Sequence, residues 1–312
     1  MRLRQNLLGL LTALTLTGGL LAHAAPEPAS AGPVGTDATT TLSFVAHPDD
    51  DLLFMNPDIA SDVQAGHNVW VVYMTAGEVH NRPAMPYADQ RIKGARAAYA
   101  RAAGVPNLWT YEAMYFNGHQ LATNRLDGTN VRLVFTFVHA ASGGCDTPGE
   151  DAQGDLYKML HDDDYVAQPI DGRAPYDRAS FTAMLKSIIT TADPAFIRTT
   201  SSIGHREDDH VDHTSAAILA ADADTTATGD TWIERNEYQG YVVRDDPATY
   251  PDNVFGYWRD EKIAIWNEYW THDPEITDGN TWSALYGRQY QLPGRSFQPG
   301  VPWVPPGDFS EC

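Results

Sequence analysis

Basic residues are scarce in this 312-residue sequence. It contains 21 Lys and Arg against 41 Asp and Glu, a formal net charge of −20. No run of Lys or Arg is present. Because so acidic a chain would repel a phosphate backbone, the composition argues against a general nucleic-acid-binding protein. The hydrophobic content of 43% is too high for a disordered chain and indicates a globular one.

Cysteine is also scarce, with two residues, Cys145 and Cys312. They are too few and too far apart in sequence for a cysteine-based metal site. Cys145 lies in a Gly-rich segment and Cys312 is the last residue. Because two cysteines in such segments usually pair in an oxidising compartment, we predict a Cys145–Cys312 disulfide. The alternative is two free thiols.

Long apolar stretches are absent except at the start of the chain, in residues 1–24. This segment begins with Arg2 and Arg4, continues with an apolar stretch and ends in the small-residue pattern 22–24. These features predict a secretory signal peptide. The alternative is a membrane anchor, but a Gly-Gly pair interrupts the stretch. No second stretch could span a bilayer, so we expect an exported protein without stable membrane insertion after cleavage.

The rest of the chain divides by composition. We expect a linker over 25–40, a catalytic domain over 41–274, and a Pro- and aromatic-rich tail over 275–312 that packs on the domain. Within the domain, apolar runs predict strands at 41–46, 68–75, 108–112, 131–140 and 195–201. Helices are expected at 53–65, 88–104, 177–192, 213–222 and 257–270.

This alternation of strands and helices predicts an α/β protein with a Rossmann-like, three-layer fold and a mostly parallel central sheet. Continuous apolar strands fit such a sheet because both of its faces are covered. Ligands in these folds bind at the carboxyl ends of the strands. We therefore expect the active site at that edge.

Two His/Asp clusters follow predicted strands directly. The first is AHPDDD at 46–51, and the second is GHREDDHVDH at 204–213. A His and a carboxylate three residues apart on a tight turn can face one ion. His210 and His213 lie near one helix face. Two imidazoles and one carboxylate are typical of a catalytic zinc site. The alternatives are solvated or helix-capping Asp residues and a calcium site, against which the histidines argue.

Four segments carry a resemblance to a known family. They are AHPDDD (46–51), TAGE (75–78), the helix ADQRIKGARAAYARAAGV (88–105) and HVDH (210–213). Together they resemble the LmbE/PIG-L family of zinc-dependent N-acetylglucosaminyl deacetylases. The resemblance covers roughly residues 41–265.

The sequence departs from the family pattern at two positions. Asp51 stands where the family usually has Glu, and Val211 stands where it usually has Pro. Neither position is a metal ligand in the family. The insertion 141–176 and the tail from 275 match no part of the pattern.

The resemblance implies one Zn²⁺ per chain. By motif position, His47 and Asp50 of the first cluster and His213 of the second correspond to the metal ligands. Zinc in such a site lowers the pKa of water to about 7 and polarises an amide carbonyl.

The resemblance also implies catalytic roles for neighbouring residues. Asp49 corresponds to the general base. His210 corresponds to the residue that stabilises the oxyanion, with Asp212 as its orienting partner, which would favour protonated His210. Arg91 corresponds to the helix Arg that contacts substrate.

Two further residues near the motifs have open roles. Glu78 of TAGE could support the site from outside the ligand set or cap a helix. His205 could be an additional ligand, but its position favours a loop role.

These features predict a secreted zinc-dependent deacetylase that hydrolyses the N-acetyl or N-acyl amide of an amino-sugar conjugate. The expected partner is an amino-sugar-containing small molecule or glycan. The alternatives are a non-catalytic secreted glycan-binding protein on the same fold and another metal-dependent hydrolase. Asp49 and His210 argue against a pure binding protein, which needs neither.

Overall fold

The computed structural model describes residues 38–78, 84–142, 154–227, 233–273 and 282–292. These belong to one compact unit, Ala31–Cys312. The predicted signal peptide, most of the predicted linker and both cysteines lie outside the described residues. Within the described ranges, no helix has the length and apolar character needed to cross a membrane.

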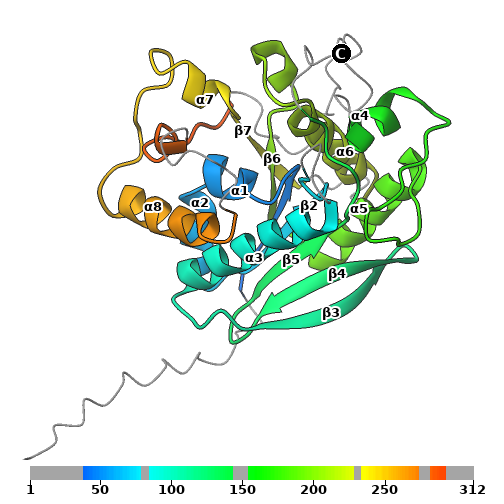
Figure 1. The fold of residues 1–312 in the computed structure, drawn as a ribbon, viewed down its shortest axis with the longest axis horizontal. Coiled ribbons are helices and arrows are strands. Elements are labelled where there is room, and N and C mark those ends of the chain that lie inside the picture. The colour runs from blue at the N-terminus through cyan, green and yellow to red at the C-terminus, as the bar shows by residue number, and fades with distance from the viewer. Residues whose placement is uncertain (1–37, 79–83, 143–153, 228–232, 274–281, 293–312) are drawn as a thin grey trace, which may run out of the picture. The chain divides into compact units, whose positions relative to one another are not determined.

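A seven-stranded sheet forms the centre of the protein, in the order β3-β4-β5-β2-β1-β6-β7 (Figure 1). Strands β5, β2, β1, β6 and β7 are parallel, and the β3–β4 hairpin extends the sheet as antiparallel strands. The predicted mostly parallel sheet is confirmed. The strands are β1 (Thr40–Val45), β2 (Asn68–Tyr73), β3 (Trp109–Phe116), β4 (His119–Leu126), β5 (Val131–Phe135), β6 (Phe196–Thr200) and β7 (Glu234–Tyr238).

Helices cover both faces of the sheet, which makes the predicted three layers (Figure 1). One apolar cluster packs the sheet against α1 (Asp50–Phe54), α2 (Asp58–Gln64), α3 (Ala84–Ala103) and α8 (Gly256–Trp270). A second cluster packs the other face against α4 (Gly154–His161), α5 (Arg178–Ala192) and α6 (Val211–Ala227). The short elements η2 (Gly204–Glu207) and α7 (Val242–Asp245) lie in connections that follow β6 and β7.

The sheet differs from the sequence-based expectation mainly at its antiparallel edge. Strand β3 runs on to Phe116, and β4 was not predicted because its sequence, HQLATNRL, is largely polar. The turn between them is Asn117-Gly118, with φ of +48° and +83°. Asn-Gly with positive φ at both positions is the strongest short hairpin signal, so a usable sequence signal was present.

The predicted helix 53–65 is two helices, α1 and α2. Pro57 separates them: it has no N–H to donate, and its ring clashes with a continuing helix. The break leaves α1 as a short helix whose first residue is Asp50. The AHPDDD turn therefore leads directly into this short helix.

The chain order places the two His/Asp clusters together. From β1 the chain proceeds to β2 on one side of the sheet, and later to β6 and β7 on the other. Neighbouring strands with diverging connections form a switch point, where ligands bind in open α/β sheets. Since AHPDDD follows β1 and GHREDDHVDH follows β6, the two clusters meet at this point.

Residues 282–292 pack against the body of the domain. Leu285 is fully buried, Gln291 forms a β-bridge with Tyr238, and the Gln289 side chain donates a hydrogen bond to the carbonyl of Met55. This segment therefore covers the connection between α1 and α2.

Candidate metal centre and active site

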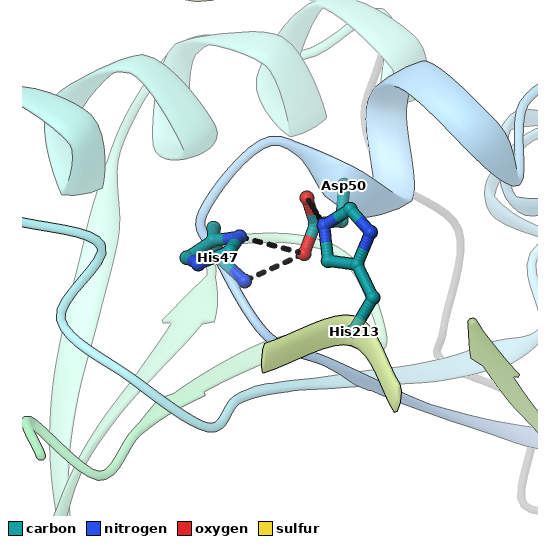
Figure 2. A group of neighbouring side chains, drawn as sticks. All are labelled: His47, Asp50 and His213. Atoms are coloured by element: carbon teal, nitrogen blue, oxygen red, sulfur yellow. Dashed lines mark hydrogen bonds and ion pairs between the residues drawn. The ribbon is translucent and has the colours of Figure 1, made fainter. Parts of the chain in front are cut away.

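Three side chains converge at the carboxyl edge of β1 and β6 (Figure 2). His47 lies in the turn after β1, Asp50 begins α1, and His213 lies in the first turn of α6. His213 Nε2 is 3.0 Å from Asp50 Oδ1, and His47 Nδ1 is 3.3 Å from Asp50 Oδ2. One ligand atom from each residue lies within 4.8 Å of the others. The predicted ligand set is thus brought together from segments some 160 residues apart in sequence.

The turn after β1 holds the first two of these residues in place. The Asp49 N–H donates to the His47 carbonyl at 2.8 Å, and the Asp50 carboxylate accepts the His47 N–H at 2.7 Å. On the other strand, the Thr200 hydroxyl donates to the His213 carbonyl. The backbone of each ligand is therefore fixed next to the strand that it follows.

The electrostatics of the three residues favour a cation. Burial alone would lower the pKa of His47, but Asp50 and Asp212 raise it to about 9. Burial would raise the pKa of Asp50, but His213 and His47 hold it well below its usual value. Anionic oxygens around two imidazoles favour positive charge here, and the same field favours a divalent ion. Two His and one carboxylate fit catalytic zinc.

The Asp212 carboxylate lies closer to His47 than to His210. Its Oδ2 lies 3.2 Å from His47 Nε2 and accepts the Ala141 N–H at 2.6 Å, whereas His210 Nδ1 is 4.0 Å away. Asp212 thus orients ligand His47, whose Nδ1 faces Asp50. His47, His210 and Asp212 form a second group of converging ligand atoms. Asp212 also contacts His210, as expected, through its backbone N–H and the 4.0 Å ion pair; its contact with His47 was not predicted.

His210 is neutral rather than protonated. Burial and the neighbouring His47 lower its pKa to about 3, and Asp212 does not offset them. The Asp212 N–H donates to His210 Nδ1 at 3.2 Å. Because Nδ1 accepts, the neutral ring carries its proton on Nε2. Asp212 raises the pKa of His210, as expected, but less than burial and His47 lower it, and the ring keeps one N–H to donate.

Asp49 forms a buried ion pair with Arg91. The Asp49 Oδ1 atom is 2.5 Å from Arg91 Nη2, and both side chains are at least 90% buried. Burial raises the pKa of Asp49 to about 6, against the lowering effect of Arg91. The base expected from the sequence thus lies beside the ligands, in an environment that brings its pKa closer to neutral.

Protein groups engage the other donors of Arg91. Nη1 donates to the Gly77 carbonyl, and Nε donates to the Tyr269 hydroxyl at 3.0 Å and lies 3.6 Å from an Asp273 oxygen. The resemblance implied a substrate contact for Arg91. That role stays a prediction. The contacts of Arg91 orient Asp49, and the contacts with Tyr269 and Asp273 were not predicted because these residues follow far along the chain.

The TAGE loop packs tightly under the AHPDDD turn. Gly77 has a φ of +63°, and a Cβ there would lie 2.6 Å from Pro48 Cδ and 2.7 Å from Arg91 Nη1. The Thr75 hydroxyl donates to the Ala46 carbonyl and accepts the Gly77 N–H. Only glycine allows this backbone shape and close approach together.

Glu78 extends this support to the loop after β5. Its carboxylate is 2.6 Å from His139 Nδ1 and accepts the Ala140 N–H. The next residue, Ala141, donates to Asp212. Glu78 therefore supports the site from outside the ligand set. His205 lies in η2 and belongs to neither converging ligand group of the described residues.

Two aromatic rings and one carboxylate complete the surroundings of His213. The rings of Phe54 and Tyr241 have centroids 5.5 and 5.1 Å from that of His213. Asp209 Oδ1 lies 3.0 Å from His213 Nδ1. The sequence signal for Asp209 was its position four residues before His213 on the entry to a helix, but the local sequence holds several other Asp residues.

Comparison with known proteins places the chain in a family. Residues 42–223 match the family model described as "PIG-L: GlcNAc-PI de-N-acetylase". Among curated proteins, none matches the sequence significantly.

Several solved structures are similar to this chain at low identity. One is the 4-carboxy-2-hydroxymuconate hydratase of Pseudomonas putida KT2440 (13% identity, 80% of this chain, 82% of that chain, TM-score 0.42). Another is a triple mutant of a deacetylase of the teicoplanin biosynthetic pathway (16% identity, 79% of this chain, 89% of that chain, TM-score 0.45). A third is the N,N′-diacetylchitobiose deacetylase of Pyrococcus horikoshii (14% identity, 79% of this chain, 73% of that chain, TM-score 0.45). Likenesses this remote carry no information about the reaction.

The match to the family model is stronger evidence of relationship, because it spans more than half of the chain and includes both His/Asp clusters. The resemblance seen in the sequence is confirmed: the chain belongs to the PIG-L, or GlcNAc-PI de-N-acetylase, family.

Proposed function

We propose that the protein is a zinc-dependent N-deacetylase that hydrolyses the N-acetyl amide of an amino-sugar conjugate. The observation that carries the proposal is the convergence of His47, Asp50 and His213 beside the buried Asp49. Membership of a family described as de-N-acetylases supports this choice of reaction.

The three ligand side chains would hold one zinc ion, which supplies Lewis-acid chemistry: it lowers the pKa of water and polarises a carbonyl. Asp49 is the general base. With its Oδ1 on Arg91, Oδ2 is the atom that accepts a proton from water and then delivers it to the departing amine. Arg91 keeps this carboxylate from rotating away.

His210 contributes a hydrogen bond to the carbonyl oxygen as negative charge develops on it. Its ring is neutral and carries its proton on Nε2, because Nδ1 accepts the Asp212 N–H. A donor fixed in advance in a buried site typically accounts for 10²–10³ in rate. The rings of Phe54 and Tyr241 pack beside His213.

We further propose that the enzyme acts outside the cytoplasm. The segment 1–24 supports this proposal through its basic start, apolar stretch and small-residue end. A substrate outside the cytoplasm would be a cell-wall glycan, an exopolysaccharide or a glycosylated metabolite. N-terminal sequencing of protein recovered from the culture medium tests this, and an intact Met1 on the recovered protein would contradict it.

Acetate release from a panel of N-acetylated amino-sugar conjugates tests the reaction. The full chain is assayed as purified, after chelation, and after zinc is restored. We expect release that chelation abolishes and zinc restores. Binding of the same conjugates without acetate release would favour the non-catalytic alternative. Hydrolysis of peptides or phosphoesters instead would favour another metal-dependent hydrolase.

A further inference from the structure

Asp209 occupies a closed position behind the candidate metal centre. Its side chain is about 1% exposed, and Oδ1 lies 3.0 Å from His213 Nδ1. The same oxygen accepts the Tyr241 N–H at 3.1 Å. The carboxylate therefore connects the start of α6 with the turn that follows β7.

Two glycines make room for this carboxylate. A Cβ on Gly240 would lie 2.1 Å from Asp209 Oδ2, and one on Gly204 would lie 2.9 Å from the same atom. Neither glycine has a positive φ, so backbone conformation does not explain them. At Gly240 the requirement is space: any side chain there would displace the Asp209 carboxylate.

The contact determines which nitrogen of His213 faces the metal site. With Nδ1 donating to Asp209, the neutral, metal-binding form of His213 would keep its proton on Nδ1 and leave Nε2, on the side of Asp50, for the ion. A carboxylate on the far nitrogen of a ligating histidine fixes its tautomer and ring orientation and increases its basicity. Removing such a partner typically lowers metal affinity 10–100-fold.

We propose that Asp209 is a positioning residue that sets the metal affinity of His213, and that Gly240 and the Tyr241 N–H hold it in place. The inference rests on the metal site of the proposed function. Gly240 and Tyr241 lie beyond residues 42–223, the part that matches the family model. A segment outside the family match thus controls a ligand inside it.

Zinc dissociation constants, measured by competition with a chromophoric chelator, test the proposal in the full chain. We expect Asp209→Ala to weaken zinc binding about 10–100-fold, and Asp209→Asn to have an intermediate effect because its amide oxygen still accepts one N–H. Gly240→Ala should weaken binding similarly, because its methyl group displaces the carboxylate.

Gly287→Ala is the matched control. A Cβ there would also meet an Asp carboxylate, that of Asp252, at 2.6 Å, in a different part of the chain. It carries a similar steric conflict but should leave the zinc dissociation constant within twofold of wild type. Equal loss in both glycine variants would overturn the proposal, since the effect would then be general destabilisation.

A double-mutant cycle separates positioning from packing. In the Asp209→Ala background, Gly240→Ala has no carboxylate to displace and should cause no further loss of zinc affinity. ¹H–¹⁵N NMR of the imidazoles adds a spectroscopic readout: the Nδ1 proton of His213 should be shifted downfield by its hydrogen bond to a carboxylate in wild type, and this shift should be lost in Asp209→Ala. If Asp209→Ala does not fold, Asp209→Asn and Gly240→Ala still decide the question.

Two negative results have different meanings. Wild-type protein that binds no zinc would contradict the proposed function. Wild-type protein that binds zinc, with unchanged affinity in Asp209→Ala, Asp209→Asn or Gly240→Ala, would overturn this inference alone.

Discussion

Arg91 Nη2 and Asp49 Oδ1 lie 2.5 Å apart in the interior of the protein and join α3 to the turn after β1. A buried ion pair is weak evidence for stability, because desolvation offsets much of the attraction. Its value here is geometric. Arg91 holds one carboxylate oxygen and leaves the other for the proposed proton transfer. Tyr269 of α8 and Asp273, just after this helix, complete the arrangement.

We therefore predict that Tyr269→Phe slows turnover about tenfold while zinc content stays the same. The variant keeps the ring, which stacks on Trp266, and loses only the hydroxyl that accepts from Arg91 Nε. A hydrogen bond to a charged group is worth about 1.5–3 kcal/mol, and about 1.4 kcal/mol corresponds to tenfold in rate.

The control for this variant is Tyr257→Phe, on the same helix. Its hydroxyl is exposed and donates to Gln64, away from the site. Turnover of this control should match wild type. If Tyr269→Phe also turns over at the wild-type rate, Arg91 does not depend on α8 for its orientation.

The neighbouring residues Asp49 and Asp50 should behave differently when each is changed to Asn. Asp49→Asn should keep about one zinc per chain and lose about 10²–10⁴ in turnover, since an amide cannot accept the proton of water. Asp50→Asn should bind zinc more weakly, and excess zinc should partly restore its activity by mass action. Metal analysis and initial rates at two zinc concentrations distinguish the variants. Zinc loss in Asp49→Asn with retention in Asp50→Asn would mean that the roles are exchanged.

The sequence was enough to find the residues that converge at the candidate site, because they lie in two short motifs that directly follow apolar strands. His47, Asp50 and His213 converge as expected, since parallel strands bring their carboxyl ends to one edge. The same reasoning found the parallel part of the sheet. It overlooked the β3–β4 hairpin although Asn117-Gly118 signalled it, because the polar strand β4 has no apolar run.

The partners of these residues were not predictable in the same way. Asp212 contacts His210, two residues away, as expected, but its carboxylate also contacts His47, which is 165 residues away in sequence. The contact of Arg91 with Asp49 was not predicted either. Both outcomes depend on how closely separate elements approach one another. Close approach is set by packing, for example by the absence of a side chain at Gly77, and local sequence does not encode it.

Zinc should stabilise the folded protein through the three predicted ligands. A ligand that binds only the folded state adds about 2.7 kcal/mol at a concentration 100 times its dissociation constant. We expect the Tm of chelated wild-type protein to rise on addition of zinc, and the Tm of His213→Ala to rise much less. Calcium should give no comparable rise, because imidazole is a poor ligand for it. Equal shifts in wild type and His213→Ala would place the stabilising ion elsewhere.

The last prediction concerns Lys262, a fully buried residue of α8 whose Nζ donates to the Arg288 carbonyl at 2.7 Å. Burial lowers its pKa to about 7, and Asp58 offsets only part of this effect. In the unfolded chain the pKa is about 10.4. Between these values the unfolded state binds a proton that the folded state does not. The free energy of unfolding therefore gains a contribution that rises with pH above 7.

Lys262→Met removes this titration but keeps an unbranched apolar chain in the same space. The unfolding free energy of the variant minus that of wild type should be level below about pH 6 and fall as pH rises from 7 to 9. The fall approaches about 1.4 kcal/mol per pH unit. Urea unfolding at four pH values measures the difference, which cancels titrations common to both proteins. Lys93→Met, on an exposed position of α3, is the control and should show no such trend. A Lys262→Met difference that is constant from pH 6 to 9 would mean that the buried amine keeps its proton throughout, paired with the Arg288 carbonyl.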